Sequence, residues 1–312
     1  VMRYTIDPGR KRPSVNFIDS IVYSRRPDLE GNMLDLEMSI MLQNGNSEMR
    51  MAAGCEGEDR KKYLKPAILW VPGGGYRGAD KNLMTAECEY LVEEGYVVAS
   101  IYYRSSAQAK WPEQIKDVKT AIRFLRANAE KYEIDPDRIG VMGRSAGGHL
   151  SAMAGMNAEG FDTEEWAGFS SDVQAAYDMF GPVDFVELME ADEIAMKDPN
   201  HRWKTVEDTH AGAIMGGDPA TMKERAKAAC VKYYISPKMA PILIMHGDAD
   251  PLVPASISEE FYQQICDAGL EERADLYLLK HAGHGTPEFF QPETKKIVVE
   301  FFDRYLKSKT PQ

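Results

Sequence analysis

Gly143-Arg144-Ser145-Ala146-Gly147 is the stretch of sequence that decides the fold. It follows a short apolar run at 138–142 and opens a run of small residues at 146–156 that is compatible with a helix. A G-x-S-x-G pattern between a strand and a helix is typical of a nucleophile elbow, a tight turn that holds a serine hydroxyl clear of a sheet. Because short glycine and serine patterns also recur by chance, the motif needs support from the rest of the chain.

Length and charge narrow the class of protein. The chain has 312 residues, of which 44% are hydrophobic, so it is long enough to bury a sizeable core. Its formal net charge is −12 and it contains no long basic run. This acidic balance argues against nucleic acid or an anionic membrane surface as the main partner. We therefore expect neither nucleic acid nor membrane among its partners.

Cysteine usage and the start of the chain bear on the cellular compartment. The four cysteines lie far apart without a C-x-x-C pair, which favours reduced or buried thiols over a zinc ribbon or a disulfide framework. No apolar run approaches the ~18 residues of a membrane span, and residues 1–7 lack the apolar centre of a signal peptide. We expect a cytoplasmic protein, with secretion as the alternative if a leader was removed. The sequence leaves open whether the chain forms a homo-oligomer.

Hydrophobic patterning predicts a sheet that is mostly parallel. Two β-like segments come first, between Phe17 and Leu42, with a turn near Pro27 and Gly31, and a polar loop follows at 43–65. Continuous apolar runs then appear, which are typical of strands buried on both faces of a parallel sheet. The predicted buried strands are 67–71, 97–102, 138–142, 175–180, 241–245 and 276–279.

The segments between these strands are predominantly helical. A helix is predicted to start at Trp111-Pro112-Glu113, and others span Ser256–Ala268 and Glu293–Leu306. Strands that alternate with helices predict an α/β fold with helices flanking the central sheet. The long segment 184–237 breaks this rhythm, because it is charged and rich in Trp, Tyr and Met. We predict one domain, 1–312, with 184–237 inserted as a helical cap.

Three consecutive glycines follow the first buried strand, in Val71-Pro72-Gly73-Gly74-Gly75-Tyr76. Without Cβ atoms, such a loop can bring backbone N–H groups close to a ligand. Donors of this kind stabilise the oxyanion of a tetrahedral intermediate. The pattern by itself is equally compatible with a simple tight turn, whereas it lacks both common nucleotide-binding glycine motifs.

Two further loops carry polar side chains just beyond predicted strands. The stretch 246–254, H-G-D-A-D-P-L-V-P, presents two carboxylates, and 281–285, H-A-G-H-G, presents two histidines. Polar groups at the carboxyl ends of parallel strands collect at one edge of the sheet. A serine, an aspartate and a histidine therefore occur in the chain order Ser, Asp, His, which is the order of the α/β-hydrolases.

Taken together, the motifs resemble those of α/β-hydrolase esterases, in the group that includes hormone-sensitive-lipase-like esterases and bacterial acetyl-xylan and feruloyl esterases. The resemblance covers Leu34 to Leu306 and is carried by the elbow with G-G-H-L after its serine, by G-D-x-D-x-x-V-P and by the late G-H-G. One departure is Pro72, which stands where hormone-sensitive-lipase-like members usually have the His of H-G-G-G. This difference favours the polysaccharide-esterase side of the group.

The resemblance implies roles for individual residues. Ser145 would be the nucleophile, His284 the base and Asp250 the carboxylate that orients it, with Asp248 as the alternative acid. The family's oxyanion donors correspond to Gly74, Gly75 and Ala146.

Other histidines are expected to have different roles. His149, four residues after the elbow serine, is expected to be a packed structural histidine, and His281 a contact at a strand end or with the cap. No group of histidines has metal-ligand spacing, so we expect neither a metal nor another cofactor.

The implied activity is hydrolysis of short-chain acyl esters, with an acetyl or feruloyl group on a plant polysaccharide or oligosaccharide as the expected substrate. Aromatic residues expected to bind it are Tyr76, Trp111 and Trp203, although each could equally be ordinary core. The alternatives are an arylformamidase or amidase, because the same three groups act on related carbonyls, and a binding protein that has lost catalysis. The presence of both Ser145 and His284 argues against the last of these.

Overall fold

The computed structural model describes residues 2–7, 9, 13–43, 64–200, 202–216 and 219–307. Its centre is a sheet in which eight strands of these ranges follow the order β1-β2-β4-β3-β5-β6-β7-β8. β1 pairs antiparallel with β2 and β2 with β4, whereas all other neighbours are parallel. The strands are β1 (Val15–Pro27), β2 (Met33–Gln43), β3 (Lys65–Val71), β4 (Val97–Ile101), β5 (Ile134–Arg144), β6 (Ala175–Met179), β7 (Ile242–Gly247) and β8 (Ala274–Leu279).

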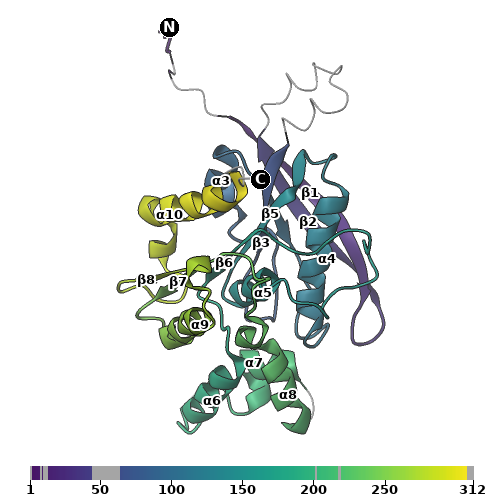
Figure 1. The fold of residues 1–312 in the computed structure, drawn as a ribbon, viewed down its shortest axis with the longest axis vertical. Coiled ribbons are helices and arrows are strands. Elements are labelled where there is room, and N and C mark those ends of the chain that lie inside the picture. The colour runs from purple at the N-terminus through teal and green to yellow at the C-terminus, as the bar shows by residue number, and fades with distance from the viewer. Residues whose placement is uncertain are drawn as a thin grey trace.

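Helices cover both faces of the sheet (Figure 1). Successive residues of a strand point to opposite faces, so Ala67 and Leu69 of β3 belong to one core cluster and Ile68 and Trp70 to the other. The first cluster is closed by α4 (Glu113–Ala127), α5 (Ala146–Gly155) and α9 (Ala255–Asp267), and the second by α3 (Glu89–Glu93) and α10 (Pro292–Phe302).

The predicted α/β architecture is confirmed. Each of the six apolar runs coincides with a strand, and the two earlier segments form the antiparallel pair β1 and β2. The predicted helix after Pro112 is α4, whose apolar stripe is fully buried at Ile115, Val118, Ile122 and Leu125. The predicted polar loop starts and ends inside strands, since Gln43 and Lys65 belong to β2 and β3. Its residues 44–63 lie outside the described residues.

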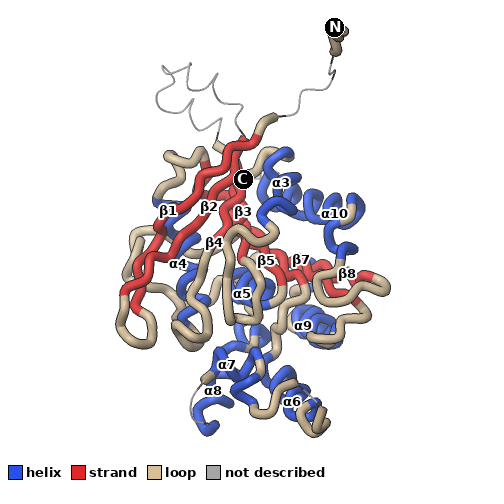
Figure 2. Tube along the Cα trace, turned by 180° about the vertical axis from the view of Figure 1, so that it is seen from behind, coloured by secondary structure: helices blue, strands red, loops and turns tan. Residues whose placement is uncertain are grey.

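Between β6 and β7 the chain forms a group of helices at one end of the molecule. They are α6 (Phe185–Ala195), α7 (His210–Met215) and α8 (Pro219–Ala229), which lie together below α5 in Figure 1 and at the foot of the reverse view in Figure 2. Asp184 begins the group as the N-cap of α6, where its carboxylate accepts hydrogen bonds from the amides of Val186 and Glu187. We refer to residues 184–237 as the cap segment.

Hydrogen bonds tie the cap segment to the sheet domain. Lys110 donates through Nζ to the carbonyl of Ala213 at 2.8 Å, and the amide of Trp111 donates to the carbonyl of Ile214 at 3.1 Å. Just before α7 begins, the Arg77 guanidinium donates to the carbonyl of Asp208 at 2.6 Å. The cap segment is therefore attached beside the loops that leave β3 and β4.

The cysteines are compatible with the expectation of free thiols. Cys88 and Cys230 are buried and Cys266 is partly buried, and all three are free. Cys55 lies outside the described residues. Burial raises the pKa of the Cys230 thiol to about 11, so it stays protonated and unreactive near neutral pH.

Candidate active site

The elbow turn joins β5 to α5 in a strained backbone conformation. Ser145 has φ 52° and ψ −123°, a positive φ that non-glycine residues rarely adopt. The turn is tight because Gly143 packs on the carbonyl of Gly147, and Gly147 packs on the carbonyl of Val71, with no space for a Cβ in either position. The Ser145 amide donates to the carbonyl of Met179 at 2.8 Å, which anchors the turn to β6.

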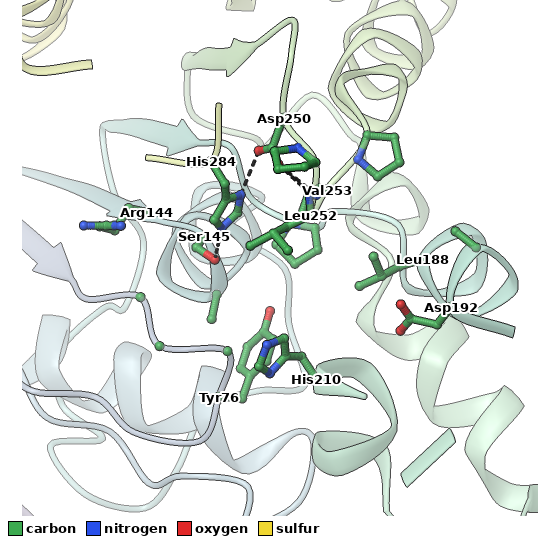
Figure 3. A pocket seen from close by; sticks show the side chains of 18 of the residues that line it. Tyr76, Arg144, Ser145, Leu188, Asp192, His210, Asp250, Leu252, Val253 and His284 are labelled. Atoms are coloured by element: carbon green, nitrogen blue, oxygen red, sulfur yellow. Dashed lines mark hydrogen bonds and ion pairs between the residues drawn. The ribbon is translucent and has the colours of Figure 1, made fainter. Parts of the chain in front are cut away.

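Three side chains from three loops meet at the carboxyl end of the parallel strands (Figure 3). His284 Nε2 lies 2.8 Å from Ser145 Oγ, and His284 Nδ1 lies 2.7 Å from Asp250 Oδ2. Because a carboxylate can only accept, Nδ1 carries the proton that it donates to Asp250, and Nε2 is left to accept from the serine hydroxyl. Phe180 holds the imidazole in place with an edge-on ring contact, at 4.7 Å between ring centroids.

The geometry distinguishes between the two candidate carboxylates. Asp250 bonds to His284, whereas Asp248 is exposed and accepts a hydrogen bond from the backbone amide of His281 at 2.6 Å. The other oxygen of Asp250 accepts from the amides of Leu252 and Val253, at 2.8 and 3.0 Å. The backbone amides of its own turn thus fix the orientation of the carboxylate, independently of its contact with the imidazole.

His246 is a further support for Asp250 that sequence reasoning did not identify. Its Nδ1 lies 2.7 Å from the Ser258 hydroxyl, and its Nε2 lies 3.0 Å from the carbonyl of Val253 and 3.3 Å from Asp250 Oδ2. Burial raises the pKa of Asp250, but hydrogen bonds from His246 and His284 outweigh it and hold this pKa well below its usual range. Asp250 is therefore a negatively charged carboxylate near neutral pH.

The glycine loop, Gly73 to Gly75, lies beside Ser145, and the amides of Gly74 and Gly75 have no hydrogen-bond acceptor among the described residues. Gly74 and Gly75 have φ values of 141° and 59°, and a Cβ at Gly75 would collide with the ring of His210, so only glycine fits there. Among the described residues, the amides of Gly74, Gly75 and Ala146 donate to no recorded protein acceptor. Ala146 is the first residue of α5, where the helix dipole adds positive potential.

Tyr76, predicted as a substrate-binding residue, lines the pocket but is only 1% exposed. Its hydroxyl lies 2.8 Å from Nδ1 of His149, whose Nε2 lies 2.7 Å from the carbonyl of Ala229 in α8. Nε2 therefore donates to Ala229 and Nδ1 accepts from Tyr76. Burial lowers the pKa of His149 to about 4, so this linking imidazole is neutral. His149 is the packed structural histidine that was predicted, and it connects the glycine loop, the elbow helix and the cap segment.

The structure corrects the prediction for Trp111. This side chain is 4% exposed and lies in the core, against the rings of His149 and Phe161, rather than among the pocket residues. The physical reason is that α4 begins beside it and carries its apolar stripe inward, which draws the indole into the same cluster. Trp203, in contrast, lines the pocket.

The pocket above Ser145 has a volume of about 500 Å³, within the range of ligand sites in other proteins. Its walls come from the glycine loop, the turn after β7 and the cap segment. Leu188, Ala191 and Ala195 of α6 line one side together with the carboxylate of Asp192. Trp203 contacts the ring of His210 edge-on at 5.2 Å between centroids. The Arg202 guanidinium stacks over Trp203 at 4.1 Å.

The structure thus assembles most of the predicted residues in one place. Ser145, Asp250, His284, Gly74, Gly75, Ala146, Tyr76 and Trp203 all line the pocket. Residues that sequence reasoning missed are Arg144 and His210 in the pocket and His246 behind Asp250. Arg144 is part of the elbow motif itself, so its position next to the serine was the available signal. His210 had no signal, because its approach to Gly75 depends on how the cap segment folds back.

The described ranges contain neither a metal-binding cluster nor a helix that could cross a membrane. No cluster of three or more His, Cys, Asp or Glu side chains in these residues could hold a metal ion. In the same part of the chain, no helix combines the length and the apolar character that crossing a membrane requires.

Known proteins with similar sequences are esterases. Esterase LipQ of Mycobacterium tuberculosis is 32% identical over 215 residues, which are 65% of this chain and 46% of that protein. Esterase LipC of the same organism is 30% identical over 226 residues, or 70% of this chain and 53% of its own. The chain thus spans about half the length of the curated relatives that it matches.

Similarity in structure extends over nearly the whole chain. A solved structure described as a truncated form of carbohydrate esterase from gut microbiota has a TM-score of 0.74 and 28% identity, and the match covers 96% of this chain and 99% of that one. The family model BD-FAE matches residues 57–265, which include the elbow and Asp250. The resemblance to α/β-hydrolase esterases that the motifs indicated is confirmed. The chain belongs to the BD-FAE family and has the α/β-hydrolase fold.

Proposed function

We propose that this chain is a serine carboxylester hydrolase that removes short acyl groups, acetyl in the first place and feruloyl in the second, from plant polysaccharide or its oligosaccharides. The observation that carries the proposal is the hydrogen-bonded series Ser145, His284 and Asp250 at the base of a pocket, next to a glycine loop with uncommitted amides. The carbohydrate esterase of similar structure supports a sugar-linked ester.

The mechanism follows from the hydrogen-bond directions. Ser145 Oγ attacks the ester carbonyl while His284 Nε2 takes its proton, and Asp250 stabilises the imidazolium that forms. The amides of Gly74, Gly75 and Ala146 are suited to hold the oxyanion of the tetrahedral intermediate. His284 then gives its proton to the departing alcohol, which leaves an acyl group on Ser145. In the second step His284 activates a water molecule that releases the acid.

Pocket shape, rather than the catalytic groups, would select the acyl chain. The wall on the side of α6 is formed by the apolar side chains of Leu188, Ala191 and Ala195 together with the carboxylate of Asp192. A wall that excludes one methylene discriminates by only ~1–3 kcal/mol, so a graded preference is expected. We expect acetyl esters to be hydrolysed best, then propionyl and butyryl esters, with a steep loss beyond about six to eight carbons.

A substrate panel tests the proposal. We would measure kcat/KM for p-nitrophenyl esters of increasing chain length, and the release of acetate and ferulate from decorated xylo-oligosaccharides. The expected result is a maximum at the shortest esters together with acetate release from the sugars. A kcat/KM for N-formylkynurenine above that for every sugar ester would replace the proposal with an arylformamidase. An optimum at long acyl chains would replace it with a lipase.

Trp203 is expected to contact bulky substrates, because its indole lines the pocket and packs against His210. Trp203→Ala should raise KM for bulky esters several-fold while nearly sparing p-nitrophenyl acetate. Trp166→Ala is a matched control, because Trp166 is 39% exposed and donates to the carbonyl of Tyr23 away from the pocket. Equal losses on both substrates in Trp203→Ala would make this residue part of the packing only.

A further inference from the structure

Arg144, between Gly143 and Ser145 of the elbow motif, carries a guanidinium with no carboxylate partner among the described residues. Arg144 lines the pocket and is partly buried, and burial lowers its pKa without any opposing contribution from an acidic group. Within the described residues, no ion pair or hydrogen bond of its side chain is recorded. Arg104 provides the contrast, because its guanidinium lies 2.7 Å from Asp117 and 2.8 Å from Glu113. Arg104 is thus paired with two carboxylates, whereas no such partner of Arg144 is found among the described residues.

Packing holds the Arg144 guanidinium in place. The side chain runs close to two glycines. If Gly285 carried a Cβ, that atom would lie 2.6 Å from Arg144 Nη2, and a Cβ on Gly73 would lie 3.3 Å from Arg144 Cγ. The ring of Phe180 lies below it, at 5.8 Å from Cζ to the ring centroid. The arginine therefore occupies a slot between two glycines, with its donors available to the pocket. A guanidinium that is fixed before ligand arrives loses little entropy on binding a planar anion.

The slot lies on the His284 side of the pocket, across Ser145 from α6 of the cap segment. Gly285, which contacts the guanidinium, directly follows His284, the residue that would protonate the departing alcohol. Figure 3 shows Arg144 pointing away from Leu188 and Asp192 of the cap segment, with Ser145 and His284 between them. A group bound by Arg144 thus belongs with the alcohol part of the substrate rather than with an acyl chain against α6.

We propose that Arg144 is a specificity residue that binds a carboxylate on the alcohol part of the ester, so that the preferred substrate is an acylated oligosaccharide with a uronic acid residue. This inference rests on the proposed function and narrows its substrate class. Arginine matches a carboxylate with two parallel hydrogen bonds. The chain as a whole carries a net charge of −12, which would repel a long polyuronate but admits a short oligosaccharide into a locally positive slot.

Paired substrates that differ only in charge test this proposal. We would compare kcat/KM for an acetylated galacturonic acid disaccharide with that for the same sugar as its neutral carboxamide. The expected ratio for the wild-type protein is about 10 to 100 in favour of the acid, as for a hydrogen bond to a charged group. Arg144→Gln should reduce this ratio to near 1, and Arg144→Lys should leave an intermediate value because it keeps the charge without the bidentate geometry. Added salt should lower the wild-type ratio.

Arg202→Gln is the matched control, because Arg202 also lines the pocket but stacks on Trp203. It should keep the charge preference of the wild type. Loss of the preference in Arg202→Gln but not in Arg144→Gln would overturn the assignment. A wild-type ratio near 1 would overturn it as well. A preference for p-nitrophenyl hydrogen succinate over p-nitrophenyl butyrate that depends on Arg144 would overturn the assignment to the alcohol side.

A binding measurement separates this inference from the proposed function. Ser145→Ala should bind an acetylated trigalacturonate more tightly than its carboxamide by calorimetry, and adding Arg144→Gln should remove the difference. Hydrolysis of p-nitrophenyl acetate by the wild type reports the esterase activity alone. A protein that fails to hydrolyse p-nitrophenyl acetate but shows the charge preference would contradict only the proposed function. A protein that hydrolyses it without any charge preference in binding would contradict only the role of Arg144.

Discussion

Ser145→Ala is expected to reduce ester hydrolysis by about 10⁶-fold, to the rate that the oxyanion donors and substrate binding alone provide. The reason is that its Oγ lies 2.8 Å from His284 Nε2, where it can give up its proton and form the acyl intermediate. The variant should fold normally, because the strained φ of 52° is a property of the turn and its two glycines rather than of the hydroxyl. Turnover of p-nitrophenyl acetate and labelling by a fluorophosphonate are the measurements.

Ser151→Ala is the matched control for this variant. Ser151 lies in the same helix, α5, and its buried hydroxyl has no recorded hydrogen-bond partner, so its removal deletes no interaction among the described residues. It should keep full turnover and full labelling. If folded Ser145→Ala retained more than a few per cent of wild-type turnover, or still reacted with the fluorophosphonate, the nucleophile would have to be another residue.

Asp250→Asn is expected to lower turnover by about 10⁴-fold, the cost of presenting the wrong imidazole tautomer. An amide nitrogen facing His284 Nδ1 would favour the tautomer whose proton is on Nε2, and this nitrogen could then no longer accept from Ser145. The same substitution removes a negative charge that lies 2.7 Å from His284 Nδ1 and 3.3 Å from His246 Nε2. The measurement is kcat for p-nitrophenyl acetate from pH 6 to 9, with thermal unfolding to verify that the variant is folded.

Asp248→Asn provides the comparison two residues away. Its side-chain oxygen can still accept from the amide of His281, so the turn should keep its shape and turnover should stay close to that of the wild type. The opposite ranking of the two variants would transfer the role of the orienting acid to Asp248. It would leave Ser145 and His284 unaffected.

Much of the fold could be predicted because its signals are local. The apolar runs at 67–71 and 138–142 indicate strands buried on both faces, and each proved to be a central strand of the sheet. The elbow could be predicted because its backbone packs so closely that glycine is required. At Gly147, for example, the carbonyl of Val71 leaves no space for a Cβ. Since each such signal resides within about ten residues of sequence, no knowledge of distant contacts was needed.

The sequence predicted less well whether a single side chain enters the core or the pocket. Trp111 and Trp203 are the same residue type in loops near helix starts, yet one is in the core with His149 and the other in the pocket with His210. The choice between Asp248 and Asp250 was also open in the residues themselves. The turn after β7 decides it, through its own amides and the buried His246.

The sequence by itself determined the wound α/β sheet, the elbow and the chain order of serine, aspartate and histidine, because these depend on periodicity and on glycine spacing. Only the tertiary structure decided which carboxylate reaches His284, that Tyr76 and His149 connect the glycine loop to α8, and that Arg144 has no acidic partner among the described residues. Each of these depends on contacts between residues tens of positions apart, whose distances arise from packing rather than from any local pattern.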